Sequence, residues 1–126
     1  MVLSREYGFR TAGFRRAGLQ EALTSIADSG YSCVELCLEE HGLLDQPEAV
    51  LAQLVSQCGD RGLRVSSLSY HGDGLAPAVR WRNIARALEL AAAASVPVLV
   101  LNGDKVTGAA PVPPFVEQVA PLVQRA

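Results

Sequence analysis

The sequence predicts an α/β fold in which four consecutive strand–helix units build one parallel sheet. Short runs of β-favouring residues alternate along the 126 residues with longer stretches that have the hydrophobic period of a helix. A helix between two strands carries the chain back to the edge where the first strand began, so the strands it joins run parallel. The predicted order is therefore βαβαβαβα.

The four predicted strands are short and separated by similar lengths of chain. The first reads YGFRTAGF and the second CVELCL; the third reads LRVSSLSY and the fourth VPVLVLN. We expect strands at residues 7–14, 33–38, 63–70 and 96–102.

The four predicted helices each carry an apolar stripe at spacings of three and four residues. Gly30 and Gly62 follow the first two helices, where a helix end needs a left-handed residue, and Ser95 takes that place after the third. The stripes consist of Leu19, Leu23, Ile26 and Ala27; Val50, Leu51, Leu54, Val55 and Cys58; Trp81, Ile84, Ala85, Leu88, Ala91 and Ala92; and Phe115, Val119, Leu122 and Val123.

The number of units predicts half of a (βα)8 barrel. Eight units fill roughly 250 residues in such barrels, and this chain holds four. A doubly wound, flavodoxin-like sheet is the alternative architecture, since it also alternates strands and helices. The first predicted strand is followed by TAGFRRAG at 11–18 and not by a glycine-rich phosphate turn, which disfavours that alternative. We expect residues 1–126 to form a single domain, a partial (half) TIM barrel.

Composition excludes several classes of function. The formal net charge of -2 offers no broad cationic surface for nucleic acid. The longest uncharged apolar stretch, residues 90–101, is too short to cross a bilayer, so we expect a cytoplasmic protein without a membrane partner. Cys33, Cys37 and Cys58 lack the spacing of a zinc site, and we expect buried, reduced thiols.

Three segments, in order, resemble the N-terminal half of the xylose isomerase-like TIM barrels. They read GLQEALTSIADSGYSCVEL, RGLRVSSLSYHGD and IARALELAAAASVPVLVLNGD, and the likeness that they mark extends over nearly the whole chain. This superfamily contains sugar phosphate isomerases and epimerases as well as the endonuclease IV type of DNA repair enzyme (AP endonuclease family 2). The stretch 36–40 lacks the histidine that xylose isomerase carries there, so the resemblance is to the superfamily and not to that enzyme.

The resemblance implies a divalent metal (Mn, Mg, Co or Zn) at the mouth of the intact barrel, chelated by a carbohydrate or sugar phosphate substrate. It also implies that the metal ligands follow the fifth and later strands, and the sequence ends at Ala126 before a fifth strand. We therefore expect a truncated chain with no metal site, no cofactor and no isomerase activity of its own. Its open sheet edges would favour self-association.

His71 and Asp73 are the first candidate site residues, because they follow the third strand and loops after parallel strands carry the chemistry of such folds. A neutral imidazole there could exchange a proton with a sugar hydroxyl, and Asp73 could orient it. We name His71 as the candidate catalytic residue and both as substrate-binding residues. The alternative is a glycine-rich polar turn in which Asp73 helps to start the next helix.

Glu35 and Arg10 are further candidates for substrate binding. Strand alternation places Glu35 with Cys33 and Cys37 on the face opposite the helices, where a carboxylate needs a partner or a role in a site. The alternative for Glu35 is a structural ion pair with Arg10 or Arg64 on a neighbouring strand.

The end of the fourth strand supplies the last candidates, Asn102 for substrate binding and Asp104 beside it. The sequence of residues 106–114 predicts a proline-bearing loop that either borders the mouth of the barrel or simply connects two elements. Arg15 and Arg16, near the first strand, read as a solvated surface rather than a phosphate site.

Three hypotheses of function remain. The first is the N-terminal part of a metal-dependent sugar (phosphate) isomerase or epimerase that abstracts a proton beside a carbonyl. The second is an abasic-site DNA repair barrel, which the two histidines and the net charge of -2 disfavour. The third is a non-catalytic half-barrel that works by self-association.

Overall fold

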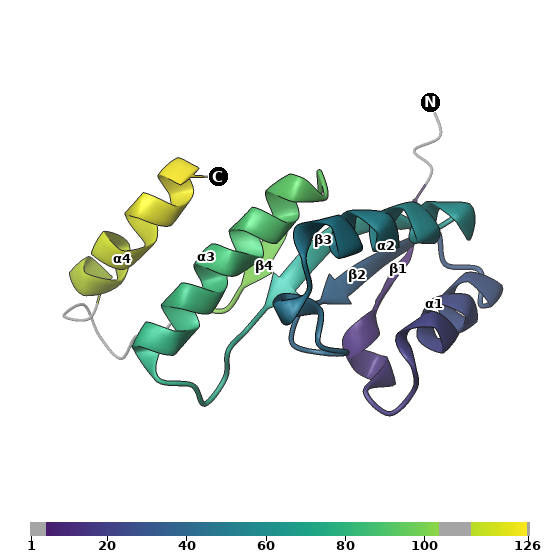
Figure 1. Ribbon diagram of the computed structural model, residues 1–126, viewed down its shortest axis with the longest axis horizontal. Coiled ribbons are helices and arrows are strands. Elements are labelled where there is room, and N and C mark those ends of the chain that lie inside the picture. Colours follow the sequence, from purple (N-terminus) through teal and green to yellow (C-terminus); the bar gives the residue numbers. More distant parts are fainter. Residues whose placement is uncertain (1–4, 104–111, 126) are drawn as a thin grey trace.

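Strands and helices alternate along the chain in the predicted order, as the computed structural model in Figure 1 shows. The structure describes residues 5–103 and 112–125. Two short 3-10 helices, η1 and η2, follow the first two strands. The elements are β1 (Gly8–Arg10), η1 (Thr11–Phe14), α1 (Leu19–Asp28), β2 (Cys33–Cys37), η2 (Leu43–Asp45), α2 (Glu48–Asp60), β3 (Arg64–Tyr70), α3 (Pro77–Ala93), β4 (Leu99–Leu101) and α4 (Val112–Arg125).

The four strands form one sheet in the order β1-β2-β3-β4, and every neighbouring pair is parallel. A flavodoxin-like sheet places its first strand between the second and the third, so the sequential order excludes that alternative. Sequential parallel strands are the arrangement of a barrel wall. The prediction of four parallel βα units is confirmed.

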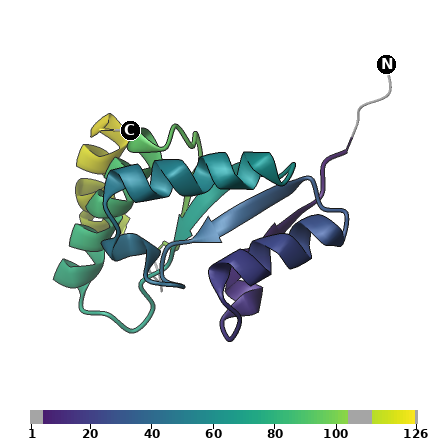
Figure 2. The same cartoon turned by 45° about the vertical axis from the view of Figure 1, so that its right-hand side comes forward.

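The core lies between the sheet and the helices, which gather on one side of it (Figures 1 and 2). Val34, Leu36 and Leu68 project from β2 and β3 into this layer and are completely buried. The apolar stripes of α1, α2 and α3 meet them, as the predicted amphipathic helices require. The helix side of this cluster includes Leu23, Ile26, Leu51, Leu54, Cys58, Ile84, Ala87, Leu90 and Ala91.

The first strand is shorter than the sequence predicts. We expected a strand over residues 7–14, but β1 ends at Arg10 and Thr11–Phe14 forms η1. The Thr11 side chain is buried, and its Oγ1 accepts a hydrogen bond from the Cys37 amide at 2.9 Å. This bond holds the start of η1 against the end of β2, so the chain turns there instead of extending the sheet.

A register shift in the pairing of β2 with β3 sets which residues of β3 face the helices. Val34 pairs with Val65, but Glu35 pairs with Ser67, so Ser66 is an extra residue on β3. After the shift Ser67 shares a face with Glu35, and Leu68 joins the core on the other face. The face of the sheet away from the helices is therefore lined with small polar side chains on β3.

Helix ends use left-handed residues at the predicted places. Gly30 and Gly62 have φ values of 85° and 74° after α1 and α2, and Ser95 has a φ of 55° after α3. The three cysteines are free and buried, also as predicted. Of the loop expected at 106–114, residues 106–111 lie outside the described residues, and 112–114 belong to the first turn of α4. Among the described helices, none has the length and apolar character needed to cross a bilayer.

Two glycines three residues apart give opposite expectations for substitution by alanine. Gly62→Ala should lower the free energy of unfolding by about 1 kcal/mol, because its φ is positive although open space surrounds it. Gly59→Ala should raise that free energy by about 0.5 kcal/mol, because Gly59 lies within α2 and alanine favours helix. Urea unfolding of both variants checks the pair, and equal effects would contradict the assigned backbone conformations.

The thiol of Cys58 makes the folding stability depend on pH in the alkaline range. Burial raises the pKa of Cys58 from 9.0 to about 11, against a smaller lowering by Arg61. Because the folded chain keeps this proton to a higher pH than the unfolded chain, folding stability should fall as pH rises from about 9 to about 11. In urea unfolding, the stability difference between the wild type and Cys58→Ala should narrow over that range. A constant difference would contradict this assignment.

Candidate functional site

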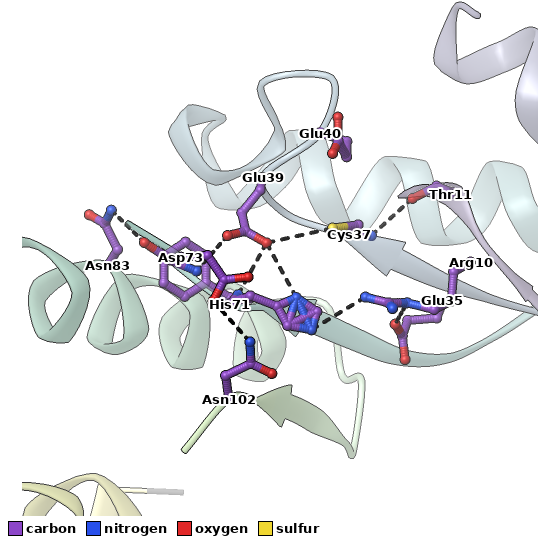
Figure 3. Close-up of polar contacts among 12 residues, drawn as sticks. Arg10, Thr11, Glu35, Cys37, Glu39, Glu40, His71, Asp73, Asn83 and Asn102 are labelled. Atoms are coloured by element: carbon purple, nitrogen blue, oxygen red, sulfur yellow. Dashed lines mark hydrogen bonds and ion pairs between the residues drawn. The ribbon is translucent and has the colours of Figure 1, made fainter. Parts of the chain in front are cut away.

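The carboxyl ends of the four strands form one rim of the sheet, and polar side chains collect there (Figure 3). Arg10 ends β1, Glu39 follows β2, His71 follows β3 and Asn102 follows β4. Three of these four residues were candidates from the sequence. Glu39 was not, although it makes several of the rim's hydrogen bonds.

Arg10 and Glu35 meet on the face of the sheet that points away from the helices. The Arg10 Nε lies 2.5 Å from Glu35 Oε1, and the Ser67 hydroxyl donates to Glu35 Oε2 at 2.9 Å. Of the two partners considered for Glu35, the structure therefore selects Arg10, while Arg64 pairs with Glu6. The partly buried carboxylate of Glu35 is thus compensated by a half-exposed guanidinium.

The imidazole of His71 lies between an arginine and a carboxylate. Its Nε2 is 3.4 Å from Arg10 Nη2, and its Nδ1 is 3.5 Å from Glu39 Oε2. A guanidinium can only donate, so Nε2 accepts from Arg10, and the tautomer that fits both neighbours carries its hydrogen on Nδ1. The lone pair on Nε2 is consequently directed along the rim, where a hydroxyl of a ligand could replace Arg10 as the donor.

Glu39 fixes the backbone that carries His71. Its Oε2 accepts the His71 amide at 3.1 Å, and its Oε1 accepts the Gly72 amide at 2.5 Å. One carboxylate thus binds two successive amides and also faces the imidazole ring. The signal for this role in the sequence is an acidic residue just after a buried strand. The sequence does not show that the end of the neighbouring strand, β3, presents two backbone amides to that residue.

Gly72 is packed tightly at the same turn. Its φ is 67°, and an added Cβ would lie 2.6 Å from Arg80 Cγ and 2.9 Å from the Tyr70 hydroxyl. Asn83 in α3 donates to that hydroxyl at 2.9 Å. A side chain at position 72 would therefore displace both the turn and the tyrosine beneath it, and only glycine fits without rearrangement.

Asp73 and Asn102 form a second polar pair across the rim. The Asn102 amide donates to Asp73 Oδ1 at 3.1 Å, which places the ends of β3 and β4 side by side. The carboxylate that faces the His71 ring belongs to Glu39, not to Asp73 as the sequence suggested. Asp73 also makes no side-chain cap on α3, whose N-terminal cap is Ala76.

The remaining candidates lie at the border of the rim or outside the described residues. Arg15 is mostly exposed and pairs with Glu40 at 2.9 Å. The second histidine, His41, contacts the Ala17 carbonyl through its Nε2 at 3.0 Å. Asp104 lies outside the described residues.

The polar groups of the rim do not fit a divalent metal. Both oxygens of Glu39 accept backbone amides, and Glu35 is paired with Arg10. Over residues 5–103 and 112–125, no group of three or more histidine, cysteine, aspartate or glutamate side chains is arranged to hold an ion. The Arg10 guanidinium, the His71 imidazole and the Asn102 amide of this rim are groups suited to hydroxyl and carbonyl oxygens.

Comparison with known proteins identifies the fold. No family model matches the chain, and no curated protein matches it. Among solved structures, the "probable 3-DHS dehydratase AsbF involved in the petrobactin synthesis from Bacillus anthracis" superposes with a TM-score of 0.71 at 12% identity over 96% of this chain. Its chain is covered over 49% of its length. The fold is half of a TIM barrel.

A second solved structure gives the same result. The D-psicose 3-epimerase, determined in the presence of D-fructose, superposes with a TM-score of 0.70 at 15% identity over 97% of this chain and 48% of its own. Both superpositions agree with the half-barrel fold that the resemblance in the sequence implied. This chain spans about half the length of each neighbour.

Glu39→Gln should loosen the turn that carries His71. A glutamine has one oxygen acceptor in place of two, so one of the two amides loses its partner. Loss of one such bond should speed hydrogen exchange of the His71 and Gly72 amides by roughly tenfold. Glu40→Gln is the matched control, since Glu40 pairs with an exposed arginine, and it should leave both amides unchanged. Unchanged protection in Glu39→Gln would contradict the assigned role.

Proposed function

We propose that the rim at the carboxyl ends of the strands binds a polyhydroxylated carbonyl compound, and that the chain is part of a sugar isomerase or epimerase. The observation that carries the proposal is the polar row of Arg10, His71 and Asn102 at this rim. In TIM barrels the active site lies at the carboxyl ends of the strands. One of the two solved neighbours is an epimerase of a ketose sugar, which agrees with the proposal.

In this proposal His71 recognises a hydroxyl of the sugar. Its Nε2 accepts from Arg10 in the free protein and would accept from a sugar hydroxyl when Arg10 turns toward the ligand. Glu39 holds the Nδ1 hydrogen and the backbone, so the ring keeps one tautomer and one orientation. His71 could then move a proton at a hydroxyl or at the carbon beside a carbonyl.

Arg10 and Asn102 complete the recognition of oxygen atoms. The guanidinium of Arg10 is half-exposed and would stabilise a carbonyl oxygen that gains negative charge, or a phosphate. The amide of Asn102 can donate to one hydroxyl while its own oxygen accepts from another. The divalent ion that the resemblance implies has no fit among the described residues, and no step of this proposal passes through it.

The DNA repair alternative gains no support from the charges at the rim. Of the three arginines near the end of β1, Arg10 and Arg15 are each paired with a glutamate. A surface that binds a phosphodiester backbone needs several cationic groups whose positive potentials add together. The pairing cancels much of the positive potential at this edge of the sheet.

The proposal predicts weak binding of a ketose at the rim. Titration of the chain with D-fructose, followed by NMR, should shift the amide signals of Arg10, His71 and Asn102. His71→Asn should raise the dissociation constant roughly threefold to tenfold, the loss expected for one hydrogen bond.

The other histidine in the sequence supplies the matched control. His41 has a φ of 58°, which asparagine tolerates, and His41→Asn should leave the affinity unchanged. Shifts that lie away from the rim, or equal affinities for the wild type and His71→Asn, would refute the proposed site.

A further inference from the structure

The β1 edge of the sheet presents backbone groups ready to pair with another strand. Within the described part of the chain, β1 has a neighbour only on its β2 side. The Tyr7 carbonyl accepts from the Ser32 amide at 3.1 Å and so points toward that neighbour. Because successive residues of a strand direct their backbone groups to opposite sides, those of Gly8 and Arg10 point outward. The side chain of Phe9 is partly exposed at this edge.

The opposite edge of the sheet, along β4, also presents backbone groups that can pair with another strand, and its side chains are more apolar. The Val98 carbonyl accepts from the Leu68 amide at 3.0 Å, so the backbone groups of Leu99 and Leu101 point outward. Val98 and Val100 are 48% and 37% exposed, and they project from the face opposite the one that Leu99 turns to the helices. An exposed apolar edge strand is prone to pair with another chain.

Helix α4 extends this apolar surface beyond β4. Val116 and Val123 are exposed seven residues apart, so both lie on one side of the helix. Val119 and Leu122 line a groove of about 470 Å³ between α3, β4 and α4. The groove and the β4 edge are continuous, because Leu99 and Leu101 line both.

We infer that a second copy of this chain covers both edges, and that two copies close into one eight-stranded parallel barrel. In this dimer β4 of each copy pairs with β1 of the other. The lengths of the solved neighbours support a second copy as the occupant, since this chain matches 49% and 48% of their chains and two copies supply the length of one of them. Four strands per copy then give the eight strands at which such a barrel closes.

The symmetry of the proposed dimer satisfies both edges at once. A two-fold rotation about the barrel axis keeps every strand parallel and creates two identical junctions. The same rotation brings the rims of both copies to one end of the barrel. Arg10 and Glu35, which face away from the helices, would then lie inside the barrel as an ion pair that is already formed. The inference does not depend on what the rim binds.

Light scattering coupled to size-exclusion chromatography tests the dimer. The wild type should elute with twice the mass of one chain, and Val100→Lys should weaken association by about a hundredfold or more, because the lysine would be desolvated on the inner face of the closed barrel. Val50→Lys is the matched control: Val50 is 41% exposed on α2, away from both edges. It should remain dimeric. Val98→Lys, at the more exposed position, repeats the test if Val100→Lys does not fold.

Hydrogen exchange identifies which surface forms the junction. The outward amides of Gly8, Arg10, Leu99 and Leu101 should be protected in the wild type and should exchange rapidly in monomeric Val100→Lys. Circular dichroism and a cooperative thermal transition should show that the monomeric variant is folded.

Three results would overturn the inference. A wild-type monomer at all concentrations up to the solubility limit would show that a second copy does not cover the edges. A dimer that Val50→Lys weakens as much as Val100→Lys, or one without protection at the four edge amides, would place the contact elsewhere. Open-ended assemblies would show that the edges pair without closing.

Discussion

The parallel pairing of β2 with β3 is the constraint on which the rest of the structure depends. Val34, Leu36 and Leu68 bury one face of these two strands beneath the helices, and this burial fixes their register. Because the strands are parallel and in register, they end at the same edge of the sheet. That coincidence brings the Glu39 carboxylate within reach of the His71 and Gly72 amides. The candidate site is therefore a consequence of core packing on the helix side of the same two strands that lead into its residues.

A continuous row of polar contacts runs along the rim, and each side chain holds the next. Glu35 contacts Arg10, Arg10 contacts the His71 ring, and the ring contacts Glu39. Such a chain holds the side chains in defined orientations before any ligand arrives, which lowers the cost of ordering them on binding. It also means that a ligand must offer oxygen atoms able to replace the Arg10 contact. Polyols and carbonyl compounds meet that requirement, whereas apolar ligands do not.

The sequence was sufficient to predict the architecture because the architecture depends on local patterns. The stripes of Leu19, Leu23 and Ile26, and the left-handed positions at Gly30 and Gly62, were recognisable without knowledge of the fold. The shortening of the first strand was not, since it depends on a hydrogen bond between Thr11 and Cys37, which are 26 residues apart.

The same distinction applies to the candidate site. Strand ends could be located, so His71 and Asn102 were placed on the correct rim. The partner of the His71 ring could not be identified, because Asp73 is its neighbour in the sequence whereas Glu39 lies 32 residues before it. Proximity along the chain favoured the wrong carboxylate, and only the register of β2 against β3 brings the right one into contact.

The extra residue at Ser66 has a consequence for how β3 can change in length. With it, the hydroxyls of Ser67 and Ser69 share the face of Glu35 and Cys37, and Leu68 remains among the helices. Deleting Ser66 would leave a regular strand in which Leu68 still pairs with Leu36 on the helix side and Ser67 still pairs with Glu35 on the other face. β3 can therefore lose one residue at this point and keep both of its faces, so a single deletion is compatible with the fold here although the position lies within a strand and far from any loop.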